Sequence, residues 1–120
     1  MLPKEKRLNL RQDFKWVASG ERLENELYKI FLKFGQNKTP RIGISLSKGV
    51  FKKAVSRNRA RRLTSVAVRA LYPALPQSLN LIILPREGVL KQNTQKLTLS
   101  LKELLVRLKA VNEKSGDKIN

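Results

Sequence analysis

The stretch LNLIIL at residues 79–84 decides the fold class, because it is apolar on both faces of an extended chain. Its short length and the proline that follows it, Pro85, favour a strand over a helix. A strand of this kind is expected at the centre of a sheet that is covered on both sides. The sequence therefore predicts a buried central strand.

Two stretches before it alternate with the period of a half-buried strand. Residues 27–34 carry one apolar row and a second row of Leu27, Lys29, Phe31 and Lys33. Residues 42–46 carry three apolar side chains opposite Gly43 and Ser45. A further short strand is expected near residues 47–51.

Three segments have helical periodicity. The first, residues 11–19, follows a possible cap formed by Asn9 and Gln12 and stops at Gly20. The second covers residues 50–72 and ends before two prolines. Its apolar stripe is predicted to be Leu63, Val66, Ala67, Ala70 and Leu71. The third is expected to be capped by Thr94 or Asn93 and carries a leucine stripe. The pattern indicates one α+β domain, followed by a polar tail at residues 112–120 that is expected to be disordered.

The charge of the chain points to a polyanionic partner. The formal net charge is +17, from 26 Lys and Arg against 9 Asp and Glu in 120 residues, far more than solubility requires. Nucleic acid is favoured over a membrane surface, because the longest apolar stretches have only the length of a strand and the start at Pro3 and Lys4 does not build a signal peptide. We expect a soluble cytoplasmic protein.

The residue types that are missing exclude several chemistries. The sequence has no Cys and no His, which excludes disulfides, zinc fingers, thiol nucleophiles and imidazole acid–base pairs. The acids are scattered among basic residues, and the six glycines do not have the spacing of a phosphate-binding loop. No catalytic residues are therefore predicted.

A basic cluster opens the second predicted helix at residues 52–62. A helical wheel places five polar residues on one arc, opposite the apolar stripe: Arg57, Asn58, Arg61, Arg62 and Arg69. Guanidinium groups suit phosphate because their planar fork donates two hydrogen bonds. Such a run is often just a solvated face, but no acid lies between Lys52 and Tyr72 to neutralise it, which favours a phosphate site. Arg59 turns toward the apolar stripe on the same wheel, so a partly structural role is expected for it.

A second constellation lies on the other row of the sheet. Phe31 sits between Lys29 and Lys33, beside the small residues of the 42–46 strand. An aromatic ring between cations suits an unpaired nucleotide strand, and Phe14 is a candidate for the opposite wall. The alternative is that both phenylalanines only fill the core between helix and sheet. Trp16 is either an edge residue or an additional stacking surface.

These residues resemble the bacterial ribonuclease P protein component over nearly the whole chain. Residues 54–63, AVSRNRARRL, resemble the RNR motif of that family, and residues 41–48, RIGISLSK, resemble the strand before it. The resemblance implies an αβββαβα two-layer sandwich with a left-handed βαβ crossover, similar to a domain of a small-subunit ribosomal protein. One domain at residues 1–111 is expected.

The resemblance also implies a function. The protein would be the non-catalytic subunit of an endonuclease, pairing 1:1 with a catalytic RNA that removes the 5′ leader from precursor tRNA with Mg²⁺ held by the RNA and substrate. No membrane partner is expected. The residues expected to bind the RNA subunit are Lys52, Lys53, Arg57, Asn58, Arg59, Arg61, Arg62 and Arg69. Those expected in the leader-binding cleft are Phe14, Lys29, Phe31, Lys33, Arg41 and Ser45.

The sequence differs from the family pattern at two places, and alternative functions were considered. Ala18 stands where many relatives carry a further aromatic residue, and the loop at residues 48–53 is one residue longer than in relatives. The rival is a general RNA chaperone or ribosome-associated protein, which would show little preference for a 5′ leader. A metal-independent nuclease would need an acid and a base that the sequence does not supply.

Overall fold

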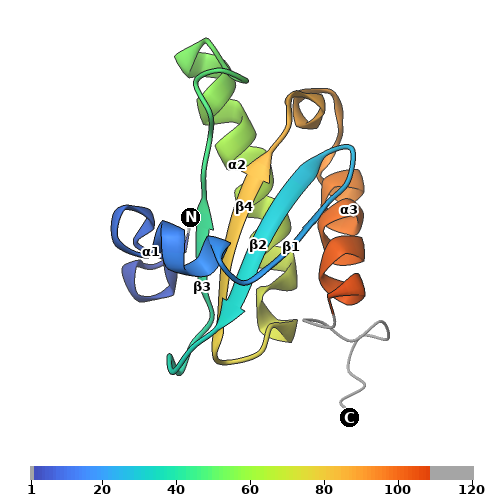
Figure 1. The fold of residues 1–120 in the computed structure, drawn as a ribbon. Coiled ribbons are helices and arrows are strands. Elements are labelled where there is room, and N and C mark those ends of the chain that lie inside the picture. Colours follow the sequence, from blue (N-terminus) through green and yellow to red (C-terminus); the bar gives the residue numbers. More distant parts are fainter. Residues whose placement is uncertain (1, 109–120) are drawn as a thin grey trace.

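The computed structural model describes residues 2–108, which form three helices and a four-stranded sheet (Figure 1). The elements in chain order are α1 (Leu10–Ala18), β1 (Glu21–Glu24), β2 (Tyr28–Phe34), β3 (Arg41–Ile44), α2 (Ala54–Leu71), β4 (Leu79–Pro85) and α3 (Thr94–Arg107). A short 3₁₀ turn, Lys4–Lys6, precedes α1, and two others, Tyr72–Ala74 and Glu87–Lys91, lie before and after β4. The αβββαβα order implied by the resemblance is confirmed. The expected domain end at residue 111 and the tail at 112–120 lie outside the described residues.

The sheet has the strand order β1-β2-β4-β3. β2 pairs antiparallel with β1 and β4, whereas β3 runs parallel to β4. β4 is buried along nearly all of its length, so the prediction of a central strand is confirmed. Ile82 of β4 has Phe31 on one side and Gly43 on the other, which fixes the register of the sheet face that α1 covers.

The connection from β3 through α2 to β4 is a left-handed crossover. In Figure 1, β3 and β4 both point upward, β4 lies to the right of β3, and α2 passes behind the sheet. Seen from the helix side, the chain therefore moves to the left, the hand that βαβ units very rarely adopt. This confirms a feature that the residues alone did not predict.

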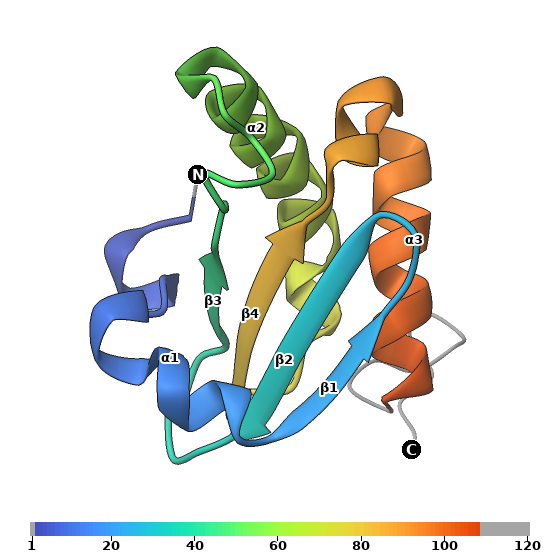
Figure 2. The ribbon, with the colours of Figure 1, turned by 45° about the horizontal axis from the view of Figure 1, so that its top comes forward.

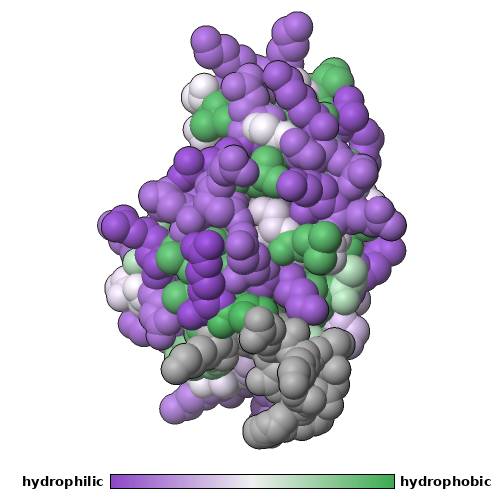
Figure 3. All heavy atoms as spheres, turned by 90° about the vertical axis from the view of Figure 1, so that its right-hand side faces the viewer, coloured by the Kyte–Doolittle hydropathy of each residue, from purple (hydrophilic) through white to green (hydrophobic). Residues whose placement is uncertain are grey.

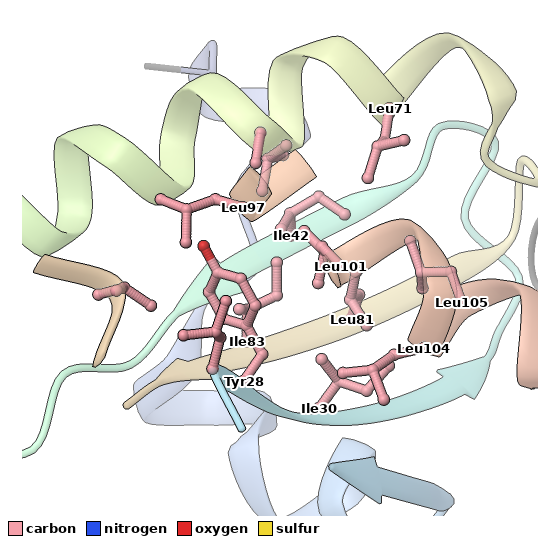
Figure 4. Close-up of a cluster of buried hydrophobic side chains, with 14 of the residues drawn as sticks. Tyr28, Ile30, Ile42, Leu71, Leu81, Ile83, Leu97, Leu101, Leu104 and Leu105 are labelled. Carbon is pink, nitrogen blue, oxygen red and sulfur yellow. The ribbon is translucent and has the colours of Figure 1, made fainter. Parts of the chain in front are cut away.

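The two faces of the sheet are covered by different helices (Figure 2). α2 and α3 pack on one face, where their leucines meet the inner rows of β2, β3 and β4 (Figure 4). The Tyr28 hydroxyl pairs with Thr64 Oγ1 at 3.2 Å inside this core. Burial raises the pKa of Tyr28, and the hydrogen bond with Thr64 lowers it by a smaller amount. On the opposite face, α1 covers a smaller core of Leu8, Val17 and Ile82.

α1 begins as the sequence predicts. The Asn9 side chain accepts a hydrogen bond from the Gln12 amide at 3.2 Å, which caps the first turn. α3 is capped in the same way by Asn93, which decides between the two predicted caps. A Cβ on Gly43 would come within 2.7 Å of Leu10 Cδ2, so this glycine allows α1 to lie directly on β3.

The prediction of a further strand at residues 47–51 is wrong. These residues turn instead, with the Val50 and Phe51 amides donating to the Ser47 carbonyl at 3.2 and 2.9 Å. The turn folds Phe51 into the core, where its side chain is buried. The additional strand is β1, whose mostly exposed residues lie at the sheet edge and lack an apolar row that the sequence could reveal.

The predicted apolar stripe of α2 is also wrong in part. The residues buried there are Ala60, Thr64, Ala67, Val68 and Leu71. Val66 and Ala70, which the sequence placed in the stripe, are exposed. Ala67 and Leu71 belong to both sets, whereas Ala60, Thr64 and Val68 are buried without having been predicted, so the buried face is rotated by part of a turn from the predicted one. The helix also begins at Ala54 rather than at residue 50.

Candidate RNA-binding surfaces

The outer side of α2 carries the basic residues that the sequence singles out. Asn58, Arg62 and Arg69 are exposed on the side of the helix away from its buried residues. Lys52 and Lys53 are exposed just before the helix begins. We call these five residues, together with Arg59, the RNR surface.

Arg57 and Arg59 have exchanged the positions that the helical wheel gives them. Arg59 is exposed, so its expected position beside the apolar stripe is wrong. Arg57 is half-buried, and its guanidinium donates to the carbonyls of Phe51 and Lys52 at 2.8 and 3.3 Å. Arg57 thus ties the preceding turn to the first turn of α2, whereas Arg59 and Arg62 are exposed to solvent.

Arg61 faces the N-terminal segment rather than open solvent. Its guanidinium donates to Asn58 Oδ1 at 3.3 Å. The residue also lines a cavity of about 170 Å³ between α2, β3 and the segment before α1. Ser65 and Arg7 contribute to the same cavity, whose other walls are mostly apolar. Arg61 therefore lies at the edge of the arc on which the sequence placed it.

The start of α2 has no side-chain cap. Lys53 occupies the cap position in an extended conformation, and its ammonium side chain cannot accept a hydrogen bond from the first amide groups of the helix. The residues that line a hollow there include Lys52, Lys53, Ser56 and Glu87. The first amide groups of a helix and its dipole both favour an anion. This end of the RNR surface is thus positive in its backbone as well as in its side chains.

The opposite face of the sheet brings two phenylalanines together. The rings of Phe14 on α1 and Phe31 on β2 meet edge to face, with centroids 6.2 Å apart. Lys29 Nζ lies 5.3 Å from the centre of the Phe31 ring. Both rings are half-buried against the small core under α1, so they contribute to packing and still present an edge to solvent. Ser45, directly after β3, is half-buried with its amide bonded to the Ile83 carbonyl at 2.9 Å.

We call Phe14, Lys29, Phe31 and Ser45 the aromatic face. The other two residues predicted for the leader site lie just beyond it along the sheet. Lys33 and Arg41 both lie opposite Asn80 of β4. Each is two residues along its strand from the position that lies opposite Ile82, which is Phe31 on β2 and Gly43 on β3. Arg41 is exposed and lines an open hollow with Lys4, Glu5 and Arg7 of the N-terminal segment.

Lys33 belongs to a group that the sequence did not reveal. Its ammonium lies 5.2 Å from the centre of the Trp16 ring and donates to Ser19 Oγ at 2.9 Å. The rim of the indole reaches Gly35 at the end of β2. No spacing pattern links Ser19 and Gly35 to a tryptophan on α1, because the contacts depend on how α1 crosses the sheet.

Carboxylates do little to neutralise these surfaces. Within residues 2–108 the ion pairs are Arg86 with Glu24 and Arg107 with Glu103, the second at 3.5 Å, and none involves α2. The same part of the chain holds no cluster of three or more acidic, histidine or cysteine side chains suited to a metal ion. None of its helices has the length and apolar character needed to cross a membrane.

Comparison with known proteins identifies the relatives of this chain. The Ribonuclease P family model matches residues 2–109. The ribonuclease P protein component of a Pseudanabaena species is 36% identical, over 93% of this chain and 98% of its own length. That of Microcystis aeruginosa is 37% identical, over 92% of this chain and 97% of its own.

Solved structures agree with these matches. The ribonuclease P protein of Thermotoga maritima superposes with a TM-score of 0.75 at 26% identity, covering 84% of this chain and 96% of that one. The Staphylococcus aureus protein superposes with a TM-score of 0.76, covering 89% and 98%. At 22% identity the second match supports the fold alone.

Proposed function

The chain belongs to the ribonuclease P protein family, and we propose that it holds the catalytic RNA with the RNR surface and the 5′ leader of precursor tRNA with the aromatic face. As a protein component of ribonuclease P it serves tRNA processing within an endoribonuclease whose chemistry the RNA carries. The general RNA chaperone or ribosome-associated protein is not favoured by these relatives.

The observation that carries the proposal is the placement of the two surfaces on opposite faces of one sheet. α2 with the RNR surface lies on one face, and α1 with Phe14 lies on the other (Figure 2). A protein only about 25 Å across its shortest axis can therefore contact two RNA segments at once. This arrangement suits a subunit that bridges an RNA enzyme and its substrate.

The chemistry of each surface fits its proposed RNA. Exposed guanidinium groups on a helix suit the phosphates of a folded RNA, because they stay charged and donate in pairs. Phe31 offers an aromatic edge to an unpaired base, and Lys29 beside it can hold a phosphate. A folded mature tRNA has no single-stranded leader to place there, so the aromatic face would raise affinity for the precursor alone.

Several finer features belong to the proposal. We place Mg²⁺ on the RNA subunit and the substrate, because the described carboxylates are dispersed. The protein then screens phosphate repulsion and positions the leader, and the RNA carries out hydrolysis. We also propose one protein per RNA subunit and a cytoplasmic location, where precursor tRNA is processed.

The proposal is tested with the full chain reconstituted on a bacterial ribonuclease P RNA. Phe31→Leu removes the ring but keeps an apolar side chain, and we expect roughly a fivefold to hundredfold loss of precursor affinity, the range expected for one lost stacking contact. Affinity for mature tRNA should not change. Loss of both affinities together, with an unchanged melting temperature, would contradict a leader-specific role for this face.

The RNR surface is tested in the same assembly. Arg62→Gln should weaken binding of the RNA subunit and lower the slope of log affinity against log salt by about 0.7 to 0.9, as expected for one lost phosphate contact. Arg107→Gln on α3 is the matched control, because it removes the same charge from the helix on which no RNA contact is proposed. Equal effects of both variants would show that only net charge matters.

A further inference from the structure

Trp16 is a large aromatic side chain left 43% exposed. Tryptophan is strongly buried on average, so this degree of exposure is unusual. The indole points to a different side of α1 from Phe14, because two residues turn a helix by about 200°. It is therefore separate from the aromatic face.

The indole is nevertheless held in one orientation. Lys33 Nζ lies 5.2 Å from the ring centre, and the same ammonium is tied to Ser19 Oγ at 2.9 Å. A Cβ at position 35 would come within 2.9 Å of Trp16 Cη2, so only glycine lets the rim of the ring rest there. A fixed aromatic ring beside a fixed cation needs little reorganisation to bind a ligand.

We infer that Trp16 and Lys33 form a second site for single-stranded RNA, in which an unpaired base stacks on the indole and Lys33 meets the adjoining phosphate. Stacking on an aromatic ring tolerates any base, because every base has a flat face. The inference rests on the proposed function, since the strand concerned would be a continuation of the 5′ leader.

The position of the site makes this continuation possible. Lys33 follows Phe31 by two residues on the same face of β2, a separation of roughly 7 Å along the strand. A strand seated on Phe31 can thus pass the end of α1 and reach Trp16.

Trp16 is the only tryptophan in the chain, which makes its fluorescence a direct report on the site. The full chain is titrated with a ten-nucleotide oligouridylate and, as a control, with an abasic strand of equal length and charge. We expect saturable quenching with the first and little with the second, because only bases stack. Equal quenching by both strands, or none by either, would overturn the inference.

Substitutions separate stacking from packing. Trp16→Phe should keep the affinity for oligouridylate within about threefold, and Trp16→Leu should lower it roughly fivefold to hundredfold. Melting temperatures are measured for both variants. If Trp16→Leu lowers the melting temperature but leaves RNA affinity unchanged, Trp16 only packs against the sheet and the inference fails.

A parallel variant distinguishes this inference from the proposed function. In Phe31→Leu, quenching of Trp16 by oligouridylate should persist while affinity for precursor tRNA falls. If Trp16 is not quenched but Phe31→Leu still lowers precursor affinity, the further inference fails and the proposed function stands. If Trp16 is quenched and Phe31→Leu has no effect, the leader site of the proposed function is wrong and the strand binds at Trp16.

Discussion

Arg57 shows that neighbouring arginines on one helix can have different tasks. Its guanidinium spans the turn before α2 through two backbone carbonyls, whereas Arg62 reaches solvent. The order of charged residues in the RNR motif does not show which arginine stabilises the turn and which is exposed. The distinction comes from the direction in which the helix presents each side chain.

A matched pair of substitutions tests this distinction. Arg57→Gln should lower the free energy of unfolding by about 1 to 3 kcal/mol, because charge-assisted hydrogen bonds to two carbonyls are lost. Arg62→Gln removes the same charge from an exposed position and should change stability by less than about 0.5 kcal/mol. Urea denaturation of both variants is the measurement, and equal midpoints would contradict the assignment.

The buried Tyr28 hydroxyl should make the folded state less stable at alkaline pH. Burial raises the pKa of this hydroxyl above the usual tyrosine value of about 10, and the hydrogen bond with Thr64 offsets part of that rise. Between the unfolded and folded pKa values the unfolded state has lost the proton that the folded state keeps, so stability falls as pH rises above about 10. The loss should be smaller in Tyr28→Phe, which has no proton to release. Thermal unfolding at pH 8 to 11 checks this, and parallel curves for the two proteins would contradict it.

Among the elements, α2 lacks the stabilising features at its start that α1 and α3 have, and it carries the surface proposed to bind the RNA subunit. α1 and α3 have asparagine caps, but α2 begins at an uncapped lysine. Its first turn also lacks an acid that would favour the helix dipole. The unmet amide groups and the clustered cations therefore coincide at the end proposed to face RNA phosphates.

Lys53→Ser should raise the stability of the fold and weaken binding of the RNA subunit. The backbone of Lys53, with φ −92° and ψ 137°, already has the conformation of a capping residue. A serine there is expected to add about 1 kcal/mol to the free energy of unfolding. The same change should weaken binding of the RNA subunit, because one cation is lost. A stabilised variant with undiminished RNA affinity at all salt concentrations would show that Lys53 contacts no phosphate.

The elements also show how far the sequence could predict this fold. The central strand, the caps and the leucine stripe of α3 followed from periodicity and are confirmed. β1 was missed because an exposed edge strand has no apolar row. The buried face of α2 was predicted only in part, because Thr64 and the small Ala60 contribute to it and give no strong hydrophobic signal. The crossover hand came only from the family resemblance, since strand and helix patterns carry no information about it.

The candidate RNA-binding surfaces could also be predicted from the sequence only in part. The charge pattern singled out the basic residues of α2, and the alternation of Lys29, Phe31 and Lys33 singled out one aromatic ring. Phe14 was a candidate for the opposite wall, and its edge-to-face contact with Phe31 is a tertiary contact that the structure supplies. The contacts that join Lys33, Trp16 and Gly35 were not predictable. They depend on the path of α1 over the sheet, which is a property of the tertiary structure.

Across the molecule as a whole, basic side chains far outnumber the acidic side chains that could form ion pairs with them. The formal net charge is +17, and residues 2–108 contain two ion pairs. On the side that carries α3, hydrophilic side chains cover most of the surface and apolar ones appear as separate patches (Figure 3). Self-repulsion must therefore oppose folding until an anion is bound.

This imbalance predicts a dependence of folding on anions. At low ionic strength the helical circular dichroism signal should be reduced, and millimolar sulfate or phosphate should restore it. Sulfate should act at lower concentration than chloride, because it binds at helix ends and between arginines rather than only screening charge. Full helicity in low salt without sulfate would show that the core alone overcomes the repulsion.

The most direct test of the account is cleavage of a precursor tRNA by a bacterial ribonuclease P RNA at low magnesium, with and without this protein. Accurate 5′ cleavage should be restored by the protein and only weakly by Phe31→Leu, and the protein alone should cut nothing. Stimulation that is equal for the wild type and Phe31→Leu would contradict a leader site on the aromatic face, and absence of stimulation with the cognate RNA would contradict the bridging role altogether.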